Sequence, residues 1–172
     1  MGLLGSGFIA QCVASIGLSL GMNVLYWSRS GHKQGMAGQY QELDVVLSRS
    51  DVVSLHVPSQ AGTIIDKTAL DKMKRHTVLI NTASSKLVDA NALYVALESN
   101  KLCAAAFDSF YTEGSDAWTC AEAKLFELGP EKFFITPHAG WRTIEADNNM
   151  FRKALDYIQD ITNKIKSREA AS

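Results

Sequence analysis

Short apolar runs alternate along the chain with longer segments in which apolar residues recur every three or four positions. The short runs predict strands and the longer segments predict helices. The predicted strands are 1–4, 24–27, 52–56, 78–81, 104–108 and 133–136; the predicted helices are 8–20, 42–48, 67–73, 89–99 and 143–166, with a further helix at 121–128. Because most strands are continuously apolar and strands alternate with helices, we expect a single doubly wound parallel α/β sheet.

The length of 172 residues suits one domain over 1–172, in which we expect 165–172 to be a frayed tail. A formal net charge of −1 gives no electrostatic reason to expect a nucleic acid or an acidic membrane as partner. No apolar window is long enough to span a membrane, and the N-terminus lacks the basic region of a signal peptide. We therefore expect a soluble, cytoplasmic protein.

The three cysteines, Cys12, Cys103 and Cys120, are odd in number and too far apart to form a C-x-x-C site. Two of them lie in apolar segments. We therefore expect reduced, mostly buried thiols and no metal site.

The first apolar run leads into a glycine-rich turn, because residues 5–10 read G-S-G-F-I-A and fit the pattern G-x-G-x-x-G/A. Strand, glycine turn and helix in this order are the context of the Rossmann dinucleotide fingerprint. Gly5 permits the tight turn, Gly7 lets backbone N–H groups approach a pyrophosphate, and the helix N-terminus attracts the anion. The alternative is a tight turn that binds nothing. The expected cofactor contacts here are Gly5, Ser6, Gly7, Phe8 and Ile9.

The second strand ends at Ser28-Arg29-Ser30, where an NAD site normally carries an Asp or Glu that accepts from the ribose hydroxyls. A carboxylate would repel a 2′-phosphate, whereas Ser28 and Ser30 can donate to one and Arg29 can pair with it through a fork of N–H groups. Lys33 adds positive charge nearby. We therefore predict NADP(H) in preference to NAD(H); a solvated basic loop is the alternative.

Polar residues follow several of the predicted strands, namely Ser28, His56, Thr82, Asp108 and His138. In doubly wound sheets the ligand lies outside the carboxyl ends of the strands. These five positions therefore predict one cleft, in which we expect His56 to lie near the cofactor rather than to act as a catalyst.

Three further segments resemble the D-isomer-specific 2-hydroxyacid dehydrogenases: 50–58 (S-D-V-V-S-L-H-V-P), 78–89 (V-L-I-N-T-A-S-S-K-L-V-D) and 136–141 (T-P-H-A-G-W). Together with the glycine motif, they occur in the order of that family and span its cofactor domain. The resemblance implies hydride transfer between a nicotinamide and a 2-oxo or 2-hydroxy acid. Nothing matches the family's substrate domain, so we expect that lid to be missing and the nicotinamide end of the site to be open.

The resemblance also implies roles for individual residues. His138 matches the general acid/base, and Glu113 matches the carboxylate that orients its imidazole for proton delivery. Asp108 matches the residue that meets the nicotinamide carboxamide. The remaining cofactor contacts implied are His56, Val57, Pro58, Thr82, Ala83 and Gly140, and His138 is also expected to contact the cofactor.

The chain departs from the family at Ser84, which occupies the position of the arginine that grips the substrate carboxylate. Serine cannot form a bidentate, charged clamp. Truncating one partner of such a pair costs about 2–5 kcal/mol, on the order of 10²–10³ or more in rate. Lys86 is two residues along and offers only a point charge. Gly114 and Phe8 replace a proline and an arginine of the family, and the loop at 59–63 is shorter.

Three interpretations stay open at this point. The chain is an oxidoreductase whose substrate needs no arginine clamp, or to which a partner chain supplies the rest of the site. Alternatively, it is a catalytically inactive NADP(H)-binding sensor or protein-interaction module. The third interpretation is a truncated fragment with exposed apolar surface. We also expect a homodimer, or a partner chain over the open cleft.

Overall fold

The computed structural model describes residues 1–108, 119–140 and 142–169. The chain divides into two units, Met1–His138 and Ala139–Ser172, which are described separately. The first contains the sheet and the second contains one long helix, α6 (Ile144–Glu169). That helix includes part of the segment 165–172 that was expected to fray, and the single domain over 1–172 stays a prediction.

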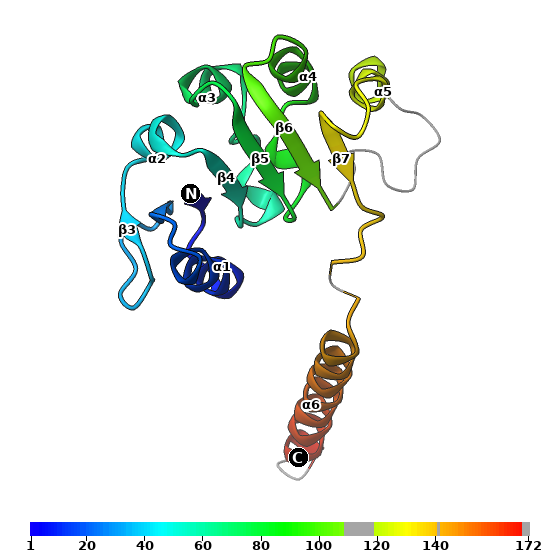
Figure 1. The fold of residues 1–172 in the computed structure, drawn as a ribbon. Coiled ribbons are helices and arrows are strands. Elements are labelled where there is room, and N and C mark those ends of the chain that lie inside the picture. Colours follow the sequence, from blue (N-terminus) through cyan, green and yellow to red (C-terminus); the bar gives the residue numbers. More distant parts are fainter. Residues whose placement is uncertain (109–118, 141, 170–172) are drawn as a thin grey trace. The chain divides into compact units, whose positions relative to one another are not determined.

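Seven parallel strands form one sheet in the described part of the first unit, in the order β3-β2-β1-β4-β5-β6-β7 (Figure 1). Strand order reverses between β1 and β4, so the sheet has a switch point there. This confirms the doubly wound α/β fold. The strands are β1 (Gly2–Leu4), β2 (Leu25–Trp27), β3 (Gln39–Tyr40), β4 (Val52–Leu55), β5 (Thr77–Asn81), β6 (Leu102–Phe107) and β7 (Phe133–Ile135).

The helices of the first unit connect these strands: α1 (Phe8–Ser19), α2 (Leu43–Arg49), α3 (Lys67–Lys72), α4 (Ala90–Glu98) and α5 (Cys120–Glu127), with two short 3-10 turns, η1 (Ser59–Ala61) and η2 (Ser85–Leu87). Every predicted strand and helix is present, with ends that differ by at most three residues. The sequence analysis missed β3, because two residues without an apolar run give no periodic signal.

The core lies on both faces of the sheet, because successive side chains of a strand point to opposite faces. Leu4 and Leu25 belong to the larger cluster, which packs against α2, α3, α4 and α5. Leu3 and Tyr26 belong to a smaller cluster that packs against α1. Figure 1 shows α1 on one side of the sheet and α2, α3 and α4 on the other. Helix α1 is thus held directly beneath β1 and β2, with its N-terminus at their carboxyl ends.

The expectation of buried cysteines was wrong, since Cys12, Cys103 and Cys120 are all free and exposed. Cys12 lies on the side of α1 that faces away from the sheet. Cys103 lies where the register between β5 and β6 shifts: Leu102 and Ala104 pair with adjacent residues of β5, which leaves Cys103 as the extra residue of a bulge. The apolar residues around these cysteines in the sequence indicated neither the outward side of α1 nor the bulge in β6.

In the part of the chain that the structure describes, no helix is long and apolar enough to cross a membrane. Helix α6 has 26 residues, but acidic and basic side chains occur along its whole length. The same described residues contain no group of three or more His, Cys, Asp or Glu side chains that could hold a metal ion.

Candidate dinucleotide-binding site

The carboxyl ends of β1, β2 and β4 meet at the switch point of the sheet, and a pocket of about 500 Å³ opens there. We call it the glycine-loop pocket. The predicted cofactor contacts that line it are Gly5, Ser6, Gly7, Ser28, Arg29, Ser30, His56, Val57 and Pro58. The structure therefore brings together residues that are up to 53 positions apart in the sequence, from Gly5 to Pro58.

A second pocket of about 350 Å³ continues from the first toward the end of β5. It shares Gly7, His56, Val57 and Pro58 with the glycine-loop pocket and adds Phe8, Ile9, Ala10, Thr82 and Ala83. Volumes of this order are typical of small-molecule sites. Two joined pockets on either side of the glycine turn suit a ligand with two ends and a central phosphate group.

The two glycines of the turn are required for different reasons. Gly5 has φ +122°, and a Cβ built on it would lie 2.3 Å from the carbonyl oxygen of His56. Gly7 has φ −69°, and a Cβ built on it would meet no protein atom within 4 Å. The fold itself therefore excludes a side chain at Gly5, whereas at Gly7 a side chain would extend into the pocket space.

Helix α1 presents unpaired donors to this pocket. Its first helical hydrogen bond runs from the Gln11 N–H to the Gly7 carbonyl (3.1 Å), so the N–H groups of Phe8, Ile9 and Ala10 have no helical acceptor. No side chain caps the helix, and its first turn carries no acidic residue. By contrast, Asp66 caps α3, and side chains also cap α4 and α5. An uncapped N-terminus at the pocket is suited to a phosphate.

The loop after β2 contributes positive charge without any negative charge. Ser28 is buried, and its hydroxyl donates to the Gly31 carbonyl (2.6 Å), so its hydrogen serves to shape the loop. Its oxygen lies 3.3 Å from the Ser30 hydroxyl oxygen. Arg29 is exposed, and its guanidinium has no hydrogen bond or ion pair among the described residues. None of the described residues that line the glycine-loop pocket is acidic.

His56 is a structural neighbour of the glycine turn. Its backbone N–H donates to the Leu4 carbonyl (2.7 Å), and its Nε2 lies 3.0 Å from the Ser54 hydroxyl oxygen. Burial lowers the pKa of His56 below its usual value, because a charged imidazole is disfavoured away from water. The side chain is therefore mostly neutral at physiological pH, and its expected place beside a cofactor stays a prediction.

The lowered pKa of His56 predicts a loss of stability below pH 6.5, the ordinary pKa of the group. Above that pH the imidazole is neutral in both states and contributes nothing. Below it the unfolded chain takes up the proton first, so the free energy of unfolding falls until the folded pKa is passed. Urea unfolding of the wild type and His56→Gln at pH 8, 7, 6 and 5 tests this. The wild-type advantage is expected to shrink below pH 6.5; a difference independent of pH would refute the assignment.

The turn after β5 is built by Asn81, which the sequence analysis did not single out. Asn81 is fully buried; its side-chain oxygen accepts from the N–H groups of Ala83 (3.1 Å) and Ser84 (3.2 Å), and its Nδ2 donates to the Ser84 carbonyl (2.8 Å). A polar residue at the end of an apolar strand was the available signal. These bonds present Thr82 and Ala83 to the second pocket and hold Ser84, half-buried, at the start of η2.

Asp108 and His138 follow the neighbouring strands β6 and β7. The Thr136 hydroxyl donates to the carboxylate of Asp108, which is 8% exposed, and so links the two strand ends. The His138 N–H donates to the Thr136 carbonyl (2.8 Å), and His138 has φ +51°, a left-handed backbone that a non-glycine residue adopts at a cost. Thr136 therefore positions both residues at this edge, a role the sequence analysis missed. Glu113 lies outside the described residues, and Gly140 belongs to the second unit.

A family model described as "D-isomer specific 2-hydroxyacid dehydrogenase, NAD binding domain" matches residues 1–140. Hydroxypyruvate reductase of Thermotoga maritima is 33% identical over 167 residues, which cover 96% of this chain and 52% of that enzyme. D-lactate dehydrogenase from Aquifex aeolicus, solved with NAD and lactic acid, has a TM-score of 0.83 and 31% identity over 94% of this chain and 53% of its own.

An acyclic imino acid reductase, solved with NADPH and D-Arg, is also similar, with a TM-score of 0.81 and 27% identity over 95% of this chain and 50% of its own. The chain thus spans about half the length of the relatives it matches. The family model covers most of the chain, and the matched strands and turns are those that build the two pockets. The chain belongs to the D-isomer-specific 2-hydroxyacid dehydrogenase family, of which it carries the NAD-binding domain.

Proposed function

We propose that the chain binds NADP(H) across the two pockets and serves hydride transfer between the nicotinamide and a 2-oxo or 2-hydroxy acid or a related carbonyl. The observation that carries the proposal is the open space at Gly7. It lies beside the uncapped start of α1 and between the two pockets, where a pyrophosphate needs backbone donors. Family membership supports a nicotinamide cofactor in this place.

The preference for NADP(H) over NAD(H) rests on charge at the end of β2. An NAD-selective site carries a carboxylate there for the ribose hydroxyls. Here the strand is followed by Ser28, Arg29 and Ser30, and the exposed guanidinium of Arg29 has no protein partner among the described residues. The Arg29 guanidinium is therefore available to pair with a 2′-phosphate. Ser28 stabilises the loop through its hydrogen bond to the Gly31 carbonyl.

In the proposed reduction the bound cofactor would supply the hydride, and His138 would deliver the proton to the substrate oxygen. Glu113 would orient the His138 imidazole, and Asp108, held by Thr136, would meet the nicotinamide carboxamide. Ser84 would offer the substrate carboxylate one neutral hydrogen bond where the family has a charged clamp. Substrate binding is therefore expected to be weak.

The function is tested by following NADPH oxidation with glyoxylate and hydroxypyruvate as substrates. We expect slow but measurable turnover, and we expect His138→Gln to lower kcat by about 10²-fold, since proton transfer by a positioned side chain contributes about 10²–10⁴. The Kd of this variant for NADPH, measured in parallel, separates a loss of proton transfer from a loss of cofactor binding. Turnover that His138→Gln leaves intact would contradict the proposed role.

Ser84 favours a second candidate, a catalytically inactive NADP(H)-binding sensor or protein-interaction module. A folded protein that binds NADPH with micromolar affinity but turns over none of these substrates, alone or with a partner chain, would support this candidate over the first.

We also propose that the chain associates with a second copy of itself and that it is cytoplasmic. Helix α1 exposes large apolar side chains, among them Phe8 (81%), Ile16 (60%) and Leu20 just after its end (71%), which supports association with a second copy. The free cysteines are compatible with a reducing, cytoplasmic compartment.

A further inference from the structure

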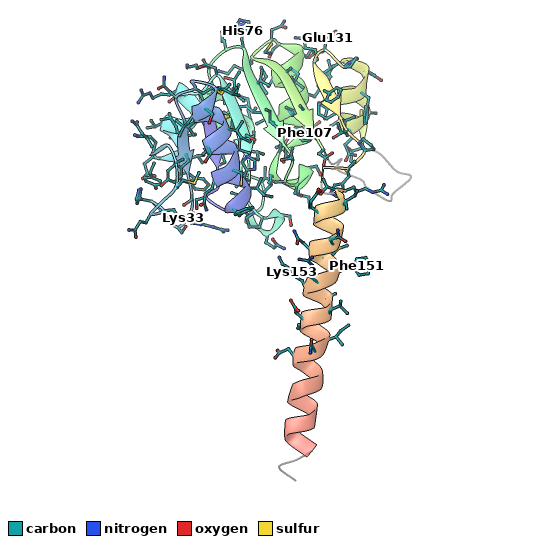
Figure 2. All side chains as sticks on the ribbon, turned by 60° about the horizontal axis from the view of Figure 1, so that its bottom comes forward. Lys33, His76, Phe107, Glu131, Phe151 and Lys153 are labelled. Carbon is teal, nitrogen blue, oxygen red and sulfur yellow. The ribbon has the colours of Figure 1, made fainter. Side chains whose placement is uncertain are left out.

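Lys33 is held at both its backbone and its side chain, although it lies in an exposed loop (Figure 2). Its N–H donates to the Tyr26 hydroxyl (3.0 Å), and that hydroxyl donates in turn to the Lys33 carbonyl (3.3 Å). Tyr26 is fully buried on β2. At the other end, the Lys33 ammonium donates to the Ser6 carbonyl in the glycine turn (2.9 Å). Lys33 therefore connects the loop after β2 to the loop after β1.

This double attachment holds the Lys33 ammonium against Ser6, which lines the glycine-loop pocket. An ammonium group has three donors, and the Ser6 carbonyl takes one. No described carboxylate forms an ion pair with Lys33. The charge and the remaining donors are therefore available beside Ser6, and Arg29 lines the same pocket as Ser6.

The bond to Ser6 also orients a peptide of the glycine turn, where a pyrophosphate would bind. A planar trans peptide directs its C=O and N–H to opposite sides. Lys33 and Gln11, whose Nε2 lies 3.3 Å from the same Ser6 oxygen, hold the carbonyl of the Ser6–Gly7 peptide, and the Gly7 N–H consequently points the other way. A lysine that only oriented this peptide would strengthen the binding of NADPH and NADH equally. A lysine that binds the 2′-phosphate would strengthen the binding of NADPH alone.

We propose that Lys33 is a specificity-determining residue whose ammonium binds the 2′-phosphate of the adenosine ribose, with Tyr26 as the positioning residue that holds it there. The proposal rests on the proposed binding of NADP(H) in the glycine-loop pocket. Arg29 lines this pocket, the Lys33 ammonium contacts Ser6 of the same lining, and none of the described lining residues is acidic. Cationic donors stabilise a phosphate dianion, and the 2′-phosphate is the part that differs between NADP(H) and NAD(H).

The test compares NADPH with NADH, and 2′,5′-ADP with 5′-AMP, in titrations of the full chain. Lys33→Met is expected to raise the Kd for NADPH and for 2′,5′-ADP by about tenfold, as for loss of one charge-assisted hydrogen bond. The Kd values for NADH and 5′-AMP should change less than about twofold. Lys67→Met removes the same charge from an exposed site on α3 and should leave all four affinities unchanged.

Tyr26→Phe tests the positioning role, with the thermal midpoint as a check that the fold survives. It should lower the preference for NADPH over NADH, by less than Lys33→Met does, because the ammonium stays but loses its fixed place. An equal loss of NADPH and NADH affinity in Lys33→Met would show an orienting role only and overturn the proposal. A wild type that binds neither nucleotide would instead overturn the proposed function, and this inference with it.

Discussion

Replacing Gly5 with alanine is expected to lower the free energy of unfolding by about 2–4 kcal/mol. The new Cβ would lie 2.3 Å from the His56 carbonyl oxygen, and the φ of +122° belongs to a region that L side chains rarely adopt. Both atoms of the clash are fixed by the sheet, because the Gly5 N–H donates to β2 and the His56 N–H donates to β1. Chemical denaturation monitored by circular dichroism measures the effect.

Gly7→Ala is the matched control, since it adds the same methyl group two residues away in the same turn. Its φ of −69° suits any residue, and its Cβ would meet no protein atom within 4 Å. The free energy of unfolding should fall by no more than about 1 kcal/mol, because alanine is only a somewhat poorer N-cap than glycine. Equal destabilisation by the two variants would contradict the assignment of Gly5 to the fold and Gly7 to the ligand.

Ser84→Arg is expected to raise kcat/KM for glyoxylate or hydroxypyruvate by about 10²-fold or more. The reason is that a guanidinium would give the substrate carboxylate two charged hydrogen bonds in place of one neutral bond. The backbone accepts the change, because Ser84 has φ −153° and ψ 134° and its main-chain atoms are held by Asn81 whatever its side chain is. Steady-state kinetics at saturating NADPH provide the measurement.

Ser84→Gln is the neutral control, because it gives a longer side chain that can donate a hydrogen bond but carries no charge. It should leave kcat/KM within a few-fold of the wild type. If Ser84→Arg binds NADPH normally and yet shows no gain over Ser84→Gln, the loss of the family arginine is not what limits this chain. The non-catalytic candidate would then be favoured.

The sequence predicted the sheet because each of its main strands is an apolar run and each is followed by a periodic helix. It predicted the pocket for a related reason: in a parallel sheet, residues just after successive strands meet at one edge. Gly5, Ser28 and His56 therefore converge in the structure although nothing links them locally. Glycine spacing also indicated the uncapped start of α1, which follows from the absence of a capping side chain at Gly7.

The contacts that hold the site in place were not predictable in the same way. Asn81, Thr136 and Tyr26 act through hydrogen bonds to residues fixed by tertiary packing, and a single sequence gives no pattern for such pairs. The donor role first given to Ser28 illustrates this, because its hydroxyl hydrogen is already engaged with Gly31. The exposure of Cys103 depends on a bulge in strand register, which hydrophobicity alone does not encode.

The most direct test of the central claim is a fluorescence titration of the wild type and Gly7→Ala with NADPH and NADH. Trp27 lines the glycine-loop pocket, so energy transfer from tryptophan to a bound nicotinamide reports occupancy. We predict saturable, micromolar binding by the wild type with NADPH favoured by about tenfold, roughly 1.4 kcal/mol, and affinity lowered by at least about tenfold in Gly7→Ala. Failure of the folded wild type to bind either nucleotide, or equal binding by both proteins, would contradict the account.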